Sequence, residues 1–448
     1  MQIKLLTVLF IGFSLLAHAQ KFSNSPFSSY GIGEAGGLDH ATFSGMGNST
    51  IAVLDTTVLN FFNPSSYAGL GKGQPLFSTG ISSRFSRYTE KGNTYNTQYA
   101  GLDHFALGVP FGNRFGLAFG LKPFSRTGYE FYDKQYAGAD TIKYIYRGSG
   151  GTNEVFAGFA VQVLKLQKHT LGIGANLGYI FGNTKNERIS YIQTGTAGGV
   201  ENTGYRLQSL HYDLGLSYKW SINKTQSLIG AAVYTPSQQL TAGINSFLAY
   251  SVDINNSNTY GILSSVDDEQ GKIIMPSTVG VGFTFITSPD PTIASNKTKL
   301  YQLTLTGEFK ATDWSVYASD FSGTRVNGGF ANTTRFSFGA QFTPHFNYLD
   351  RGNNISYMNR VRYRLGVYHA SLPIVVASKQ QSDLGVTVGF GFPIAIQRSS
   401  SSVNLGITAG KRGNGLDQSL NEQYIGINFG VTISPGYNDR WFRKFKID

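Results

Sequence analysis

The chain of 448 residues contains no cysteine and few charged residues. Without cysteine it can form no disulfide, thiolate metal site or thiol nucleophile, and it cannot be lipidated through an N-terminal cysteine. Charged residues make up 14% of the sequence, against about 25% in typical soluble domains. Beyond residue 20 no apolar run approaches the roughly 20 residues of a spanning helix, so a membrane protein of this kind must span as a closed β-barrel.

Glycine and aromatic residues are abundant, with 55 Gly, 33 Phe and 26 Tyr. The formal net charge is +11, from 37 Lys and Arg against 26 Asp and Glu. Such a surplus attracts phosphates, anionic ligands or acidic partners without choosing among them. The basic residues are dispersed along the chain, so no nucleic-acid interface is indicated.

The first residues have the pattern of an export signal. Lys4 precedes an apolar run from Leu5 to Leu16, and Ala17–His18–Ala19 matches a small-x-small cleavage site. We predict a signal peptide over residues 1–19 and a mature chain that begins at Gln20.

Strict alternation of apolar and polar residues dominates the rest of the chain. Every second residue from Ile425 to Ile433 is apolar and the residues between are mostly polar or glycine; Leu384–Phe392 repeats the pattern. A soluble β-sandwich also alternates, but its strands average about 5–6 residues, whereas spanning strands need roughly 9–11 and end on aromatic girdles. The strands are predicted at residues 76–88, 98–110, 114–132, 141–164, 169–188, 204–220, 227–243, 273–287, 299–314, 332–344, 358–371, 382–396, 402–411 and 422–433.

The sequence therefore predicts an all-β protein, a transmembrane antiparallel up-and-down β-barrel of about 14 strands in the bacterial outer membrane. The barrel should occupy residues 76–433. Short periplasmic turns and long external loops are expected, the longest loops being Thr184–Thr203 and Ile244–Lys272. Two predicted periplasmic connections, Ser288–Thr298 and Pro344–Tyr357, are longer than this rule suggests.

The two ends of the mature chain lack this alternation. Residues 20–75 are rich in Gly, Ser and Asn but hold enough apolar residues to fold, and we predict that they form a plug inside the lumen. Residues 434–448 are predicted to be a periplasmic tail containing Trp441, Phe442, Arg443 and Phe445. The tail could lie against anionic headgroups or dock a periplasmic or outer-membrane protein.

The plan of signal peptide, plug and barrel resembles the FadL-like family of long-chain fatty acid and hydrocarbon transporters. Its most local match is Asn63–Pro64–Ser65, where the family usually has Asn-Pro-Ala. The tail after the last strand departs from the family's transporters, and Arg360–Tyr368 resembles a strand of accessory barrels of the same fold. Some of those relatives serve secretion or barrel-assembly machines.

The resemblance implies passive transport, in which a hydrophobic ligand passes from external loops to a site against the plug and leaves through the barrel wall. Next to the Asn63–Pro64 turn, Leu59, Phe61 and Phe62 are the candidates for such a site. The alternative is that these side chains only pack the plug against the lumen wall.

Charged residues in the predicted strands should face the lumen. Arg362 and Arg364 alternate with Val361, Tyr363 and Leu365, which are expected to face lipid. The two arginines could hold a ligand carboxylate or pair with acids of the plug or lumen such as Glu308, and pairing is the expectation for charges at membrane depth.

No catalytic constellation is predicted. The seven His have no ligand spacing, and the sequence lacks H-E-x-x-H, G-x-S-x-G and P-loop motifs. Asp267–Asp268–Glu269 could bind calcium, but a solvated loop is the simpler interpretation. We therefore predict no enzyme, no cofactor and no metal site.

Two functions remain open: passive uptake of a hydrophobic small molecule such as a long-chain fatty acid, or a non-transporting scaffold subunit of an outer-membrane secretion or assembly complex. Both imply contact with outer-membrane lipid. The first adds a hydrophobic ligand, and the second adds outer-membrane or periplasmic protein partners. Fold alone does not decide between them.

Overall fold

The computed structural model describes residues 25–36, 40–71, 74–138, 140–289, 300–345, 356–394, 400–416 and 419–435. The predicted signal peptide and the predicted tail beyond Pro435, including Trp441, lie outside the described residues. In the described part of the chain, helices are all too short or too polar to cross a membrane.

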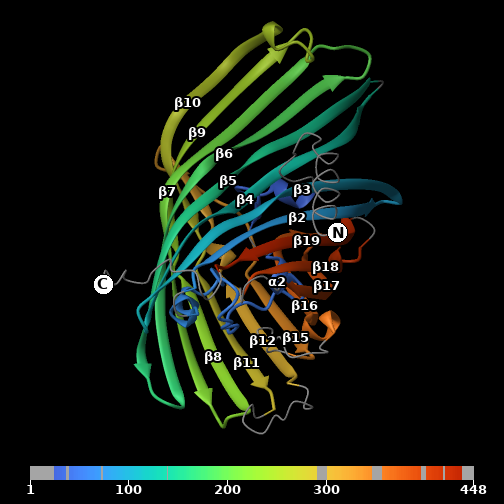
Figure 1. The fold of residues 1–448 in the computed structure, drawn as a ribbon. Helices are drawn as coiled ribbons and strands as arrows, with labels where there is room; N and C mark the ends of the chain where they lie inside the picture. Colours follow the sequence, from blue (N-terminus) through green and yellow to red (C-terminus); the bar gives the residue numbers. More distant parts are fainter. Residues whose placement is uncertain are drawn as a thin grey trace.

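One antiparallel sheet closes on itself when the last strand pairs with the first of the wall, for example Phe429 with Ile81. Figure 1 shows the strands following one another round the wall in chain order. They are β2 (Leu76–Glu90), β3 (Asn93–Phe111), β4 (Phe115–Ala137), β5 (Asp140–Lys165), β6 (His169–Ile192), β7 (Gly198–Ser221), β8 (Gln226–Thr235), β9 (Gln238–Ser251), β10 (Tyr260–Met275), β11 (Thr278–Thr287), β12 (Gln302–Thr312), β13 (Ala318–Phe321), β14 (Thr324–Asn327), β15 (Thr333–Thr343), β16 (Arg362–Val376), β17 (Lys379–Pro393), β18 (Ser402–Gly413) and β19 (Asn421–Ile433).

The barrel has 14 strands, as the sequence predicted. The pairs β8–β9, β10–β11, β12–β13 and β14–β15 each run in one line, so that two labels make one strand of the wall. The alternation also has the predicted sense. On β19, Ile425 and Ile427 point outward and are exposed, whereas Glu422 and Asn428 point inward and are buried.

The prediction of long external loops at Thr184–Thr203 and Ile244–Lys272 is wrong. Residues 184–192 continue β6 and residues 198–203 begin β7, which leaves only 193–197 as a turn; likewise β9 extends to Ser251 and β10 begins at Tyr260. These polar stretches form strands because each backbone group finds a partner on the neighbouring strand even above the membrane. The result is a tall wall made by β4–β7, β9 and β10, which rises beyond the other strands (Figure 1).

The outward face of the tall wall shows where lipid ends. On β6 the outward apolar series ends at Phe181 and is followed by exposed Asn183 and Lys185; on β7 the series ends at Leu210, beside exposed Gln208. Because water-facing strands need no apolar outer face, this change marks the external membrane boundary.

The wall is interrupted beside β7. Proline cannot donate to a strand ladder, and Pro236 separates β8 from β9. Backbone pairing of β7 stops at Leu214 and resumes at Leu207. In the gap the Gln238 side chain replaces the ladder: it accepts a hydrogen bond from the Tyr212 N–H at 3.0 Å and donates to the Tyr212 carbonyl at 2.9 Å. We call residues 208–213 and 235–241 the β7 seam.

Residues 25–36 and 40–71, which we call the lumenal segment, lie inside the barrel (Figure 1). The segment contains η1 (Pro26–Ser29), β1 (Glu34–Ala35), α2 (Ala41–Ser44) and η2 (Pro64–Gly69). Near the external end β1 pairs with Ser125 and Arg126 of β4, and toward the periplasmic end η2 packs on β5 and β6. The lumen is thus filled along much of its height.

Candidate functional site

The Asn63–Pro64–Ser65 motif forms the start of η2. Asn63 caps this helix because its Oδ1 accepts hydrogen bonds from the Ser65 N–H at 3.0 Å and the Ser65 hydroxyl at 2.8 Å. Pro64 occupies the first helical position, where no N–H is needed. The Asn63 amide donates to the Ile51 carbonyl at 2.7 Å. The Ser at position 65, which departs from the family pattern, therefore adds a second bond to the cap.

The three predicted apolar site residues lie between the lumenal segment and the wall. Leu59 and Phe61 are buried in a cluster with Tyr67, Phe156 and residues of β2–β5, and Phe62 packs against that cluster and a second one around Phe43. These three side chains, with Asn63 and Pro64, do not line the periplasmic pocket described below. Their contacts are those of packing residues.

Glu308 of β12 holds the backbone of the lumenal segment. Its Oε2 accepts hydrogen bonds from the Thr50 N–H at 2.6 Å and the Ile51 N–H at 2.9 Å. A carboxylate that receives two N–H groups in a buried site is strongly bonded. Glu308 thus contacts the segment, as its inward position suggested, but through backbone N–H groups and not through the two candidate arginines.

Arg362 pairs with an acid of the lumenal segment. Its Nη1 lies 3.4 Å from Asp55 Oδ2, and its Nη2 donates to the Thr57 hydroxyl at 3.0 Å. Burial alone would raise the pKa of Asp55, but Arg362 and the Thr57 hydrogen bonds outweigh it and leave that pKa below its ordinary value. The predicted pairing with a plug acid is therefore present at Asp55.

Arg364 is 1% exposed and bonds to neutral groups, with Nε donating to Gln341 at 2.8 Å and Nη1 to Asn404 at 2.9 Å. Both arginines point inward as predicted, and Leu365 points outward. Val361, which was expected to face lipid, is instead fully buried. It precedes the first residue of β16, so strand alternation does not apply to it.

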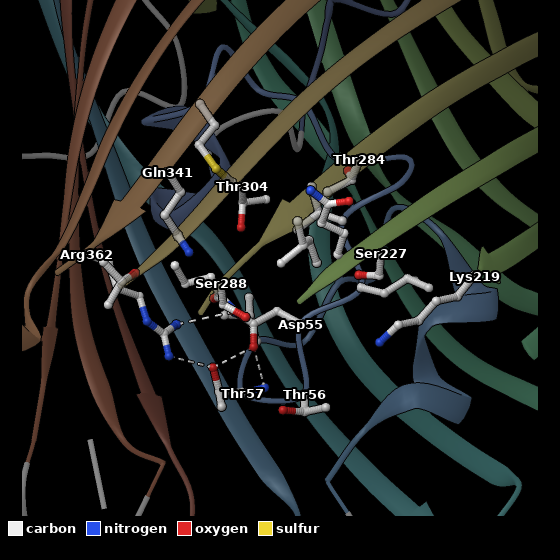
Figure 2. Close-up of a pocket in the computed structure, with 18 of the residues that line it drawn as sticks. Asp55, Thr56, Thr57, Lys219, Ser227, Thr284, Ser288, Thr304, Gln341 and Arg362 are labelled. Carbon is white, nitrogen blue, oxygen red and sulfur yellow. Dashed lines mark hydrogen bonds and ion pairs between the residues drawn. The ribbon is translucent and has the colours of Figure 1, made fainter. Parts of the chain in front are cut away.

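A pocket of about 410 Å³ lies between residues 53–58 of the lumenal segment and the periplasmic ends of several strands. Figure 2 shows Arg362 and Asp55 meeting at one side of it and Lys219 of β7 reaching in from the other. Hydroxyl and amide groups such as Thr284, Thr304 and Gln341 line one part of it, and another part is apolar, formed by Phe43, Met46, Val53, Leu54, Val58 and Ile286. The pocket therefore offers both polar and apolar contacts.

The structure brings together two histidines for which the sequence showed no ligand spacing. His40 stacks on His104, whose Nδ1 lies 2.6 Å from Asp103 Oδ2 and whose Nε2 lies 2.8 Å from the Ser78 hydroxyl. The order is that of a Ser–His–Asp triad, but Ser78, Asp103 and His104 are each 1% exposed, beneath the lumenal segment. The only sequence signal was the adjacent Asp–His pair in β3, where a register shift follows Gly80 of β2.

A second polar cluster lies at the β7 seam, which contributes two of its residues. Ligand atoms of Glu154, His211 and Asp213 lie within 4.8 Å of one another, a spacing that could hold a metal ion. Lys122 Nζ, however, lies 3.3 Å from Glu154 and already supplies a cation. We therefore interpret the group as an internal ion-pair network, which is the usual arrangement for charges at membrane depth.

A model of the BamG family matches residues 1–448 of this chain. Among solved structures, a toluene transporter of Pseudomonas putida, TodX, is 13% identical with a TM-score of 0.53, covering 92% of this chain and 100% of that chain. A FadL homologue of Pseudomonas aeruginosa is 10% identical with a TM-score of 0.51, covering 89% and 98%. No curated protein sequence matches the chain. The fold is that of the FadL-like barrels, and the chain is an outer-membrane β-barrel.

Proposed function

Because the chain belongs to the BamG family over its whole length, we propose that it is an accessory barrel of an outer-membrane secretion or assembly complex. In this role the barrel presents surfaces to partner proteins, and its lumen carries nothing. The observation that best supports the proposal is the close packing of the lumenal segment against the wall. A carrier needs a part that can move, whereas a scaffold needs a rigid one.

The segment touches the wall backbone to backbone. A Cβ placed on Gly339 of β15 would lie 2.5 Å from the Met46 carbonyl oxygen, and one on Gly174 of β6 would lie 2.5 Å from the Pro64 carbonyl carbon. These inward glycines let the segment lie directly on the strands. Together with the Glu308 and Arg362 contacts, this leaves little room for the segment to shift without breaking buried polar bonds.

Purification of the intact chain from its native outer membrane tests the proposal. An affinity tag in the exposed turn around Asn255 and Asn256, between β9 and β10, leaves the chain ends free. In mild detergent we expect other outer-membrane or periplasmic proteins to co-purify in fixed ratio, and depletion should lower the amount of other outer-membrane barrels. A lone monomer, with unchanged barrel levels on depletion, contradicts the proposal.

We further propose that the predicted tail contributes to such docking. It combines Trp441, Phe442 and Phe445 with Arg443, and aromatic and arginine side chains are frequent anchors of protein interfaces. Alanine at these four positions should reduce co-purification, while Asn438→Ala in the same tail should not. If the fourfold variant retains its partners but leaves the membrane more easily in salt, the tail binds headgroups instead.

Uptake of a hydrophobic small molecule is the second candidate, and the β7 seam favours it. The seam is a break in the wall where side-chain bonds of Gln238 replace the ladder. Under this proposal Leu59, Phe61 and Phe62 would contact the ligand once the segment moved. Uptake of a labelled long-chain fatty acid by cells should then fall on deletion of the gene, and an unchanged rate removes this candidate.

A further inference from the structure

The outer surface of β17, β18, β19 and β2 carries a groove that neither proposed function uses. Its volume is about 1000 Å³, and the upper part of the β2–β3 hairpin forms one side. β3 pairs with β4 only from Phe105 to Phe111, so above that level the β2–β3 hairpin is free of β4 on one side, while β2 remains paired with β19 as far as Thr89 on the other (Figure 1). The groove therefore lies where the wall continues upward as β17, β18, β19, β2 and β3 without β4.

Two neighbouring cross-strand rows run through the groove. The lower row is mostly apolar and consists of Val386, Ala409, Ile425, Phe85 and Gln98, each paired with the next. The row above it consists of Leu384, Lys411, Gln423, Arg87 and Asn96, paired in the same way. All ten residues line the groove.

The change between these rows places the groove at the external membrane boundary. Below it, Phe85, Val386 and Ile425 point outward and are about half exposed, at 47%, 57% and 52%, as expected for side chains that touch lipid tails. Above it, Lys411 and Arg87 are exposed on the same outward face. The two cations thus stand at headgroup level, directly over an apolar hollow.

Four exposed cations of the tall wall, Arg147, Lys185, Arg188 and Arg206, each form an ion pair with a carboxylate. Lys134 and Lys272, which are exposed on the same wall, form no ion pair among the described residues. Within the described ranges neither Lys411 nor Arg87 has such a pair; the nearest polar contact of Arg87 is Asn96 Oδ1, 3.4 Å from its Nε. None of the described residues that line the groove is acidic. Two positive charges without a counter-charge are complementary to a phosphate-bearing headgroup.

The spacing suits a headgroup with two phosphates. Lys411 lies on β18 and Arg87 on β2, with Gln423 of β19 between them in the row. Neighbouring strands are about 4.8 Å apart, so the two backbones are separated by roughly 10 Å. Gln423 offers an amide between the charges, and the acyl chains would extend down over Ala409, Ile425 and Phe85.

We propose that this basic groove binds a phosphate-bearing anionic lipid of the outer leaflet, with its phosphates on Arg87 and Lys411 and its acyl chains in the apolar hollow. The site would fix one lipid to one side of the barrel. It differs from ordinary interfacial contact because the two cations stand over a concave site with an apolar lower part.

The test uses the full chain in phosphatidylcholine nanodiscs containing lipid A, with bound lipid counted by native mass spectrometry. Each cation near an anionic headgroup contributes roughly fivefold in affinity, so R87Q/K411Q should weaken lipid A binding about 30-fold. The matched control is K134Q/K272Q, which removes the same charge from the tall wall and should leave binding unchanged. Heat-modifiable gel mobility checks that each variant is a folded barrel.

A second pair of measurements separates a lipid site from a phosphate site. Phe85→Asn should weaken binding of lipid A without changing the affinity for its deacylated, bisphosphorylated disaccharide. The proposal is overturned if R87Q/K411Q retains lipid A as wild type does, or if the deacylated disaccharide binds as tightly as lipid A.

Discussion

The imidazole of His40 in the lumenal segment stacks on the imidazole of His104 in β3, with 4.5 Å between ring centroids and 10° between ring planes. His40 is buried, and its Nδ1 accepts a hydrogen bond from the Thr42 N–H at 3.2 Å. Burial, followed by the nearby His104 and Arg364, holds the pKa of His40 well below its ordinary value. His40 is therefore neutral while the lumenal segment is docked inside the barrel.

Because His40 is neutral in this contact, we predict that low pH weakens the docking of the lumenal segment in the barrel. When the segment leaves the lumen, His40 regains an ordinary pKa near 6.5 and binds a proton that the docked state excludes. Docking should therefore weaken as pH falls below about 6.5, by up to roughly 1.4 kcal/mol per pH unit. Limited proteolysis of residues 40–71 in detergent, from about pH 7.5 to about pH 5, measures this. His40→Asn keeps a cap acceptor and should flatten the profile; an unchanged profile argues against the assignment.

The Arg362–Asp55 pair should contribute modestly to docking. The side chains are 13% and 28% exposed, and a partly exposed pair is worth about 1 kcal/mol or less. Hydrogen exchange of the Thr57 and Val58 amides in Arg362→Gln, Asp55→Asn and the double variant gives the coupling free energy. Because the pKa of Asp55 is lowered, the contribution is present above its ordinary value near 3.9 and disappears as pH falls through the folded value. Additive effects would show no coupling.

Asn63 and Ser65 should differ in importance although they share a hydrogen bond. Asn63→Ala removes the cap of η2 and leaves the buried Ile51 carbonyl without its donor, which should cost about 2 kcal/mol. Ser65→Ala removes one hydroxyl bond and restores the family's alanine, so about 0.5 kcal/mol is expected. The free energy of unfolding in urea, followed by gel mobility, distinguishes the two. Equal losses would mean that the cap is unimportant.

Gly339 should tolerate no side chain. In Gly339→Ala the new methyl group would lie 2.5 Å from the Met46 carbonyl oxygen, and overpacking of this kind costs about 1–3 kcal/mol. Gly230 of β8 is the control, because a Cβ there meets no atom within 4 Å, and Gly230→Ala should be nearly neutral. A comparison of their thermal unfolding midpoints tests the closeness of the segment to the wall.

Gln238 should hold the β7 seam closed. Gln238→Ala removes both hydrogen bonds to Tyr212, and the amides of residues 208–213 should then exchange with solvent faster, by about tenfold for a loss near 1.4 kcal/mol. Gln239→Ala, on the opposite face of the same strand, should not change that exchange. If both variants behave alike, the seam is held by other contacts.

The strands were predictable because alternation is a local property. Ile427 points outward and Asn428 inward because the outer side of the wall meets lipid, and the order of residues along the strand is enough to predict this. The external loops were not predictable in the same way. Polar stretches such as residues 184–192 and 260–272 form strands only because a partner strand of equal length lies beside them.

In the candidate sites, too, the direction of a side chain was predictable from the sequence, whereas its partner was not. That Arg362, Arg364 and Glu308 face inward followed from their positions in alternating strands. The partners of Arg362 and Glu308, which are Asp55 and Thr50, lie more than 250 residues away in the chain. Nothing in the sequence around His40 or His104 indicated that the two rings stack. The row of Leu384, Lys411, Gln423, Arg87 and Asn96 is likewise set by register between strands.

The amino-acid order alone determined that this chain forms a closed barrel with an apolar outside, because side-chain alternation is written residue by residue. Only the tertiary structure decided how high each strand rises, which glycines admit the lumenal segment, and which charges meet. Those outcomes depend on strand register and on contacts between distant residues, and neither is encoded in any short stretch of sequence.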